Sequence, residues 1–263
     1  MNKHIILCAD DYGQNEAISA GILRLVQLGR INAVSCMVNM PSWAQASSAL
    51  IGMKSSLYIG LHLNLTDGVP FTPLPVLIKN AYLRRLNVQA IAAEIQTQIN
   101  AFVDAMEVYP DFIDGHQHVH QLPMVRDALL LVYKRMGLKA FIRNTHNGWH
   151  DLWSFQGFPK RQLIALLGGM TLRRLLVKQG ISSNTSFAGI YPFHQSAHYR
   201  DYFKPFLGQI QEGGLIMCHP GDPSEDPTDP LSPYRHHELH YFLSDEFLSD
   251  LKANSIQLRC KDI

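Results

Sequence analysis

The feature that most constrains the fold is a regular alternation of short apolar runs with longer segments of helical periodicity. The apolar runs, each long enough for a buried strand, cover residues 4–9, 33–40, 57–65, 111–114, 140–143, 185–190, 215–218 and 256–260. Between them, the pattern predicts helices over 15–28, 42–51, 88–108, 124–136, 160–179, 198–211 and 238–253. Strands that alternate with helices in this way predict βαβ units and a parallel sheet.

The number of these units indicates the architecture. Seven or eight repeats in 263 residues fit a single α/β domain, 1–263, built as a (β/α) barrel, better than an open dinucleotide-binding sheet. No GxGxxG follows the first strand, which also argues against a dinucleotide cofactor. The Pro-rich segments 66–87 and 219–235 are expected to be long loops. In a barrel, the loops that follow the strands build the site.

Composition excludes several classes of protein. With Lys+Arg 23 and Asp+Glu 22, the net charge of +1 gives no basic excess for nucleic-acid binding. No apolar run approaches the roughly 20 residues of a membrane span, and no signal peptide is visible. The cysteines lie far apart with no CxxC pair, so we expect buried, reduced thiols and a cytoplasmic location. They are Cys8, Cys36, Cys218 and Cys260.

Side chains with metal or proton chemistry follow four of the predicted strands. Strand ends converge on one face of a barrel, so residues about 50 apart in sequence can share one pocket. Two imidazoles and one carboxylate make a three-ligand metal site with room for a water. A second carboxylate can accept a proton there, and a further imidazole can donate one. The residues that supply this set are Asp10, Asp11, His62, His116 and His219.

Local geometry limits how these residues can act. Neighbours on an extended strand point to opposite faces, so Asp10 and Asp11 can serve one site only if the chain turns, and Gly13 is expected to allow that turn. His62 shares the polar face of its strand with Asn64. The histidines at 116, 118 and 120 would point the same way in an extended chain, and of these His116 is favoured as a ligand.

Four motifs together resemble a known family. They are Ala-Asp-Asp-Tyr-Gly at 9–13, Gly-Leu-His-Leu at 60–63, Asp-Gly-His-Gln-His-Val-His at 114–120 and Cys-His-Pro-Gly at 218–221. Their order and spacing are similar to those of the YdjC-like carbohydrate deacetylases, which resemble chitooligosaccharide deacetylases. The resemblance implies a distorted TIM-like (β/α) barrel and metal-dependent removal of an N-acetyl group from an amino sugar.

The same resemblance implies roles for individual residues. Asp11, His62 and His116 would hold the metal, Asp10 would be the general base, and His219 would be the general acid. The cofactor would be one divalent ion: ligand softness favours zinc, other family members are described with magnesium, and manganese, cobalt or nickel would also fit.

The partner implied is an N-acetylated sugar, and no motif names which one. Tyr12 and Arg143 are expected to contact this substrate, although Arg143 could instead orient Asp10. Aromatic residues in or beside predicted loops could stack on a sugar ring. They are Phe71, Trp149, Trp153, Tyr191 and Phe193. The sequence leaves open whether the chain is a monomer or a homodimer.

Two other functions remain to be distinguished. A phosphoesterase-like hydrolase often needs a second metal, for which Asp114, His118 and His120 are candidate ligands. A sugar-binding protein without catalysis would not need Asp10 and His219, so the presence of both disfavours it. A cyclic-amidohydrolase arrangement is disfavoured because the His-x-His motif follows the fourth strand, not the first.

Overall fold

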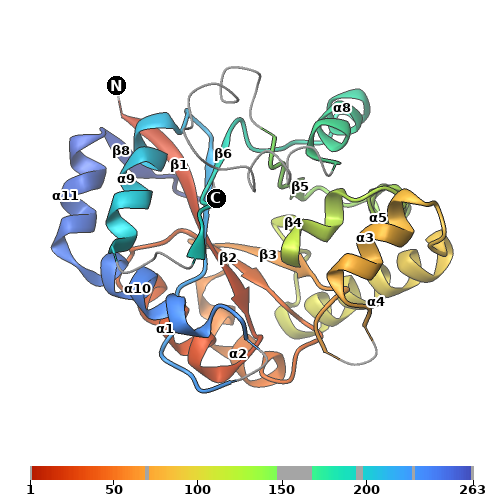
Figure 1. Ribbon diagram of the computed structural model, residues 1–263, viewed down its shortest axis with the longest axis horizontal. Helices are drawn as coiled ribbons and strands as arrows, with labels where there is room; N and C mark the ends of the chain where they lie inside the picture. Colours follow the sequence, from red (N-terminus) through yellow and green to blue (C-terminus); the bar gives the residue numbers. More distant parts are fainter. Residues whose placement is uncertain (1, 69–70, 147–167, 194–197, 227–228, 262–263) are drawn as a thin grey trace.

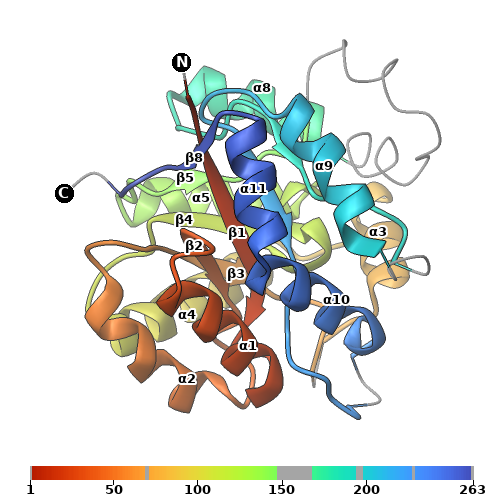
Figure 2. The same cartoon turned by 90° about the vertical axis from the view of Figure 1, so that its left-hand side faces the viewer.

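The structure is a computed structural model that describes residues 2–68, 71–146, 168–193, 198–226 and 229–261 (Figures 1 and 2). Its strands are β1 (Lys3–Tyr12), β2 (Ala33–Cys36), β3 (Tyr58–Leu63), β4 (Phe112–Gly115), β5 (Phe141–Ile142), β6 (Phe187–Ala188), β7 (Leu215–Cys218) and β8 (Ile256–Leu258). Its α-helices are α1 (Glu16–Gln27), α2 (Trp43–Leu50), α3 (Leu74–Tyr82), α4 (Val88–Met106), α5 (Val125–Arg135), α8 (Met170–Gln179), α9 (Tyr199–Gln209), α10 (Ser232–Leu243) and α11 (Asp245–Ala253). Two 3₁₀ helices are η1 (Ile51–Met53) and η2 (His116–Gln121).

The strands form one curled parallel sheet, as the alternation predicts. Their order is β5-β4-β3-β2-β1-β7-β6, and β8 pairs with the first residues of β1. Across the described residues, β5 and β6 share no ladder, so the barrel is not fully closed. Asn184 connects the two ends: its side chain accepts the Asn144 N–H at 2.8 Å and donates to the carbonyls of Asn144 and Ser186. The predicted α/β barrel is confirmed in this distorted form.

Side-chain alternation on β1 separates two apolar cores. Ile5 and Leu7 pack in the larger cluster between the sheet and its helices, which surround the sheet in Figures 1 and 2. Ile6 and Cys8 belong to a smaller cluster with residues of the neighbouring strands. The same period of two assigns the next position, Asp10, to the side of the smaller cluster. The strand pattern therefore carries one carboxylate into the barrel interior.

Two helices lie where the sequence predicts loops. Helix α3 forms within 66–87 because Pro73 is its N-cap and Pro75 lies in its first turn, where the missing proline N–H costs no helical hydrogen bond. Helix α10 begins at Ser232, inside the expected loop 219–235. Ser244 ends α10 and caps α11, so the single helix predicted over 238–253 is two. Both segments were expected to be loops because they are rich in proline, but prolines in the first turn of a helix are compatible with it.

The predictions for membrane segments and thiols can be compared directly with the structure. In the described ranges, no helix is both long enough and apolar enough to cross a membrane. All four cysteines are free, and Cys8, Cys36 and Cys218 are buried. Cys260 is exposed, so the expectation of a buried thiol is wrong there, because it follows the short edge strand β8.

Candidate active site

The end of β1 places two adjacent carboxylates in one site. Asp11 has a left-handed backbone (φ 68°), and the register with β2 shifts between Ala9 and Tyr12. This irregularity breaks the alternation, so Asp10 and Asp11 both line the same cavity, 1% and 0% exposed. The expected turn exists, but Asp11 itself makes it. Gly13 also has a positive φ, two residues later.

The three expected metal ligands lie together. Asp11 Oδ1 is 3.3 Å from His62 Nε2 and 3.0 Å from His116 Nδ1. One ligand atom from each of the three residues lies within 4.8 Å of the others, and all three are buried. Burial alone would raise the pKa of Asp11, but Arg235 and His116 outweigh it and hold that pKa well below its ordinary value. Asp11 is therefore a carboxylate at all moderate pH values.

His62 is oriented by groups on two other strands. Its Nδ1 is 2.6 Å from Asp114 Oδ1 and 3.0 Å from Ser35 Oγ, which leaves Nε2 facing Asp11. A carboxylate on one ring nitrogen fixes the orientation of a histidine whose other nitrogen binds a metal.

The histidines at 116, 118 and 120 separate because the chain leaves β4 after Gly115. Gln117 and His118 both have left-handed backbones (φ 52° and 60°), which rules out the expected common direction. His116 reaches Asp11, and its Nε2 is 2.9 Å from Asp67 Oδ2. His118 lines the cavity outside the metal-ligand group, and His120 donates through Nε2 to the Arg143 carbonyl at 3.0 Å.

Arg143 is fully buried between two carboxylates. Its Nη1 and Nη2 donate to the two oxygens of Asp10 at 2.6 Å each, and Nη2 is 2.6 Å from Asp114 Oδ2. Burial would raise the pKa of Asp10, but the Arg143 charge and hydrogen bonds outweigh it and lower that pKa to about 2. Arg143 does not line the cavity and its guanidinium is bonded to Asp10, so we do not retain it as a substrate contact.

His219 follows β7 and faces Asp10 across the cavity. Its Nε2 is 4.0 Å from Asp10 Oδ2, and its backbone N–H donates to Glu238 Oε2 at 2.6 Å. Burial lowers the pKa of His219 from its ordinary value to about 4, although Asp11 and Asp10 oppose that shift. The imidazole is therefore neutral at rest near pH 7.

These residues open into a cavity of about 610 Å³. Leu74 and Ile78 of α3 line it, as does Phe193. Tyr12 does not: it is buried in the larger apolar core and its hydroxyl donates to the Ala46 carbonyl at 2.8 Å, so we do not retain it as a substrate contact. Trp149 and Trp153 lie outside the described residues.

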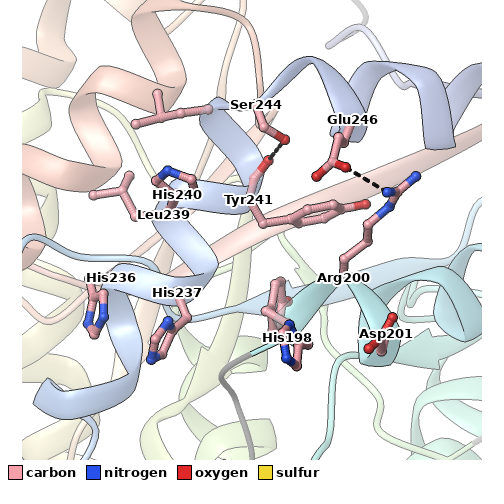
Figure 3. Close-up of a pocket in the computed structure, with 12 residues that line it drawn as sticks. His198, Arg200, Asp201, His236, His237, Leu239, His240, Tyr241, Ser244 and Glu246 are labelled. Carbon is pink, nitrogen blue, oxygen red and sulfur yellow. Dashed lines mark hydrogen bonds and ion pairs between the residues drawn. The ribbon is translucent and has the colours of Figure 1, made fainter.

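A second cavity, of about 710 Å³, lies beside α10, α9 and the start of α11 (Figure 3). It is lined by His236, His237 and His240 of α10, by His198 beside α9, and by Glu246 of α11. Within the described chain, these histidines do not bring three ligand atoms together as Asp11, His62 and His116 do. The catalytic candidates thus belong to the cavity at the strand ends.

Several residues that shape the site escaped the sequence reasoning. Arg235 of α10 donates to Asp11 Oδ2 at 2.9 Å and to Asp229 at 2.6 Å. Glu238 of the same helix accepts from His219. Ser35 and Asp67 contact the two histidine ligands. None of them lies in a motif, and no pattern in the sequence marks them, because their burial and their partners come from the packing of distant segments.

The donor set at Asp11, His62 and His116 fits a divalent metal ion. Burial lowers the pKa values of His62 and His116, but neighbouring carboxylates outweigh it and raise them to about 10 and about 9. The site therefore favours positive charge where the ligand atoms converge. Two imidazoles and a carboxylate are a combination that holds divalent transition metals in proteins.

Comparisons with known proteins point to one family. The sequence profile of the YdjC-like protein family matches residues 4–253. A chitooligosaccharide deacetylase of Enterobacter sp. (strain 638) is 30% identical over 162 residues, which cover 58% of this chain and 64% of that protein. A carbohydrate deacetylase of Homo sapiens is 26% identical over 301 residues, which cover 98% of this chain and 90% of that protein.

The fold comparison extends over nearly the whole chain. An Enterococcus faecalis crystal structure, provisionally described as a cellobiose-phosphate cleavage protein, superposes with a TM-score of 0.73 at 18% identity. The superposition covers 98% of this chain and 97% of that one. At this identity the likeness shows a common fold. The chain spans less than two thirds of the length of the first curated relatives that it matches.

Proposed function

The chain belongs to the YdjC-like family, and from this membership and the geometry of its site we propose that it is a metal-dependent carbohydrate deacetylase. The reaction would be hydrolysis of an N-acetylated amino sugar to the free amine and acetate. Relatives named as chitooligosaccharide and carbohydrate deacetylases support this reaction class. The substrate would be a chitooligosaccharide-like or N-acetylglucosaminyl sugar.

One observation carries the proposal. A carboxylate and an imidazole, Asp10 and His219, face each other at 4.0 Å, beside the buried group Asp11, His62 and His116. All five line one cavity at the strand ends. Hydrolysis of an amide needs a base for the water, an acid for the departing amine and a stabilised oxyanion. Asp10 and His219 would supply the base and the acid, and the metal site would stabilise the oxyanion.

The residues would divide the work as follows. Asp11, His62 and His116 would hold one divalent ion, zinc or magnesium by the arguments above, with manganese, cobalt or nickel also compatible. When bound, such an ion polarises the acetyl carbonyl and makes water more acidic. Asp10 Oδ2 accepts a proton from the attacking water. His219 Nε2 donates a proton to the nitrogen as the C–N bond breaks.

The proton on His219 must arrive during the cycle. Burial keeps the His219 pKa near 4, so the imidazole is neutral before the reaction. Asp10 Oδ2 lies 4.0 Å from its Nε2 and takes the water proton first. Asp10 then passes this proton to His219, which gives it to the amine nitrogen, while the remaining OH of the water joins the acetyl carbon, so both protons of the water are accounted for.

Arg143 argues against the phosphoesterase alternative. The expected second-metal ligands Asp114, His118 and His120 do not form a group of close ligand atoms among the described residues, where the other such group is Cys8, Asp10 and Asp114. The Arg143 guanidinium already bonds Asp10 and Asp114 at 2.6 Å. A fixed cation therefore occupies the place of a second ion, and a one-metal hydrolase is the better supported function.

The test is acetate release from N-acetylglucosamine, chitobiose, chitotriose and an N-acetylglucosaminyl lipid. Each would be incubated with chelator and then with zinc, magnesium, manganese, cobalt or nickel added back. We expect metal-dependent acetate from at least one of them. Phosphate release from phosphate esters without acetate would favour the phosphoesterase, and tight sugar binding without acetate would favour the non-catalytic sugar-binding protein.

A further inference from the structure

Helix α10 presents two different faces. Arg235 and Glu238, one turn apart, are 2% and 0% exposed and turn toward the catalytic cavity. His236, His237 and His240 line the outer cavity shown in Figure 3. A buried arginine and a buried glutamate at this spacing are costly unless each has a partner. Their partners show what the inner face does.

Arg235 and Glu238 each form a hydrogen bond with the backbone of His219. Its N–H donates to Glu238 Oε2 at 2.6 Å, and its carbonyl accepts from Arg235 Nη1 at 3.5 Å. The second oxygen of Glu238 accepts the Tyr191 hydroxyl at 2.6 Å. Strand β7 ends at Cys218, so residue 219 has left the sheet ladder, and α10 holds its peptide groups instead.

The side chain of His219 has no comparable fixation. In the described ranges, its buried Nδ1 has no hydrogen-bond partner, and Nε2 stands 4.0 Å from Asp10. The ring of Phe193 meets the imidazole edge-on, with centroids 5.6 Å apart. Among the described residues, no carboxylate forms a hydrogen bond with this imidazole as Asp114 does with His62. The direction of its Nε2 must therefore depend on where the main chain of residue 219 is held.

We propose that Glu238 is a positioning residue: it fixes the peptide of His219 so that Nε2 faces the departing nitrogen. The proposal rests on the proposed function, since it takes His219 as the proton donor. The reach of the side chain to the His219 N–H is what matters, not its charge. A misplacement of about 1 Å can cost roughly 100-fold in rate, so the expected effect is large.

Two substitutions separate reach from charge. Glu238→Gln keeps the length and can still accept from the His219 N–H, so it should retain activity within about threefold, since a neutral acceptor replaces a charged one. Glu238→Asp keeps the charge but withdraws the carboxylate by one methylene. We expect it to lower kcat for an N-acetylated chitooligosaccharide roughly 10- to 100-fold, with KM little changed.

The choice of leaving group makes the test specific. With 4-nitrophenyl acetate, the C–O bond breaks and the electron pair leaves as a stable phenolate, which needs no proton from His219. Glu238→Asp should therefore keep activity on this ester within about threefold while losing it on the amide. A merely destabilised enzyme would lose both activities in parallel.

A second readout needs no turnover. In protein labelled with ¹⁵N-histidine, the short bond to Glu238 should shift the His219 amide proton downfield, and loss of that peak in His219→Gln assigns it. Glu238→Asp should move this peak upfield, and Glu238→Gln should move it by much less. If Glu238→Asp does not fold, Tyr191→Phe, which frees one oxygen of Glu238, should show the same selective loss on the amide at about five- to tenfold, beyond the threefold margin of Glu238→Gln.

Glu246→Gln is the matched control, because Glu246 lies on the outer cavity in an exposed ion pair with Arg200 (Figure 3). It should behave as wild type. Equal losses on amide and ester, no loss in Glu238→Asp, or a greater loss in Glu238→Gln than in Glu238→Asp would overturn the positioning role. No acetate from either substrate with wild-type protein and any metal would instead refute the proposed function.

Discussion

Replacing Arg143 with methionine tests the balance of buried charge in the site. The guanidinium is fully buried and makes three contacts of 2.6 Å, two to Asp10 and one to Asp114. Methionine has a similar length and no charge, so Arg143→Met leaves two buried carboxylates without their cation. Arg143→Lys keeps the charge but cannot form the same fork of hydrogen bonds.

Arg143→Met should have two effects, a loss of stability and a rise in the pKa of Asp10, and the structure gives the size of each. Breaking a buried ion pair by removing one partner costs about 3–5 kcal/mol of stability. The pKa of Asp10 is about 2, against an ordinary 3.8, and burial alone would raise it above 3.8. Removing Arg143 should therefore raise this pKa by at least about 1.8 units, which is about 2.5 kcal/mol in proton affinity. In Arg143→Lys, both the stability and the pKa of Asp10 should lie between those of Arg143→Met and wild type.

Two assays check this reasoning. Urea unfolding at pH 7 measures the stability loss, and the acid limb of the kcat/KM profile reports the pKa of the base in the free enzyme. Because an ionised Asp10 is the active form, the limb should move to higher pH in Arg143→Met. An unchanged acid limb together with an unfolding free energy within about 1 kcal/mol of wild type would refute the account of Arg143.

Three further predictions concern single residues. Asp10→Asn should lower kcat by roughly 100-fold or more and keep the metal, as measured by acetate release and elemental analysis; loss of the metal would make Asp10 a ligand. His116→Ala should lose metal and activity together, and unchanged metal content would transfer the ligand role to His118. Burial raises the pKa of Glu238 to about 7, so its contribution to stability is full below about pH 4.5 and is lost as pH rises through 7. Urea unfolding of wild type should therefore weaken between pH 5 and pH 8 by about 2–3 kcal/mol more than that of Glu238→Gln, and parallel curves would contradict this shift.

Much of the fold could be predicted because its signals are local. Period-two alternation on β1 and helical stripes such as 88–108 come from burial on one side, which the sequence records directly. The site residues were predictable for a related reason. In a parallel sheet each of Asp10, His62, His116 and His219 lies at the same edge if the strands are identified correctly.

What escaped prediction depends on contacts between distant segments or on single backbone angles. The left-handed conformation of Asp11 and Gln117 decides which side chains converge, and the residue type at these positions does not predict that conformation. Helix α3 was not predicted because its first residues include prolines, which are equally common in loops. The role of Glu238 depends on α10 packing against the end of β7, which no pattern within α10 predicts.

The protonation of the metal-ligand histidines leads to a final prediction about metal uptake. Burial opposes their charge, but Asp114 and Asp11 outweigh it, and the pKa values reach about 10 for His62 and about 9 for His116. Both imidazoles therefore carry an extra proton at pH 7.5 in the metal-free protein. His62 can keep its Nδ1 proton on Asp114, so the proton to be displaced is the one on Nε2, which faces Asp11 at 3.3 Å.

A histidine must lose this proton to bind a metal, so uptake of one ion should release about two protons. Calorimetric titration with zinc in buffers of different ionisation enthalpy measures the number of protons released. Below pH 8, the apparent Kd should fall roughly 100-fold for each unit by which the pH rises. His116→Gln, with one histidine left, should release about one proton and bind more weakly. A release near zero in wild type would mean that the imidazoles are already neutral, and that the carboxylates around them do not set their charge.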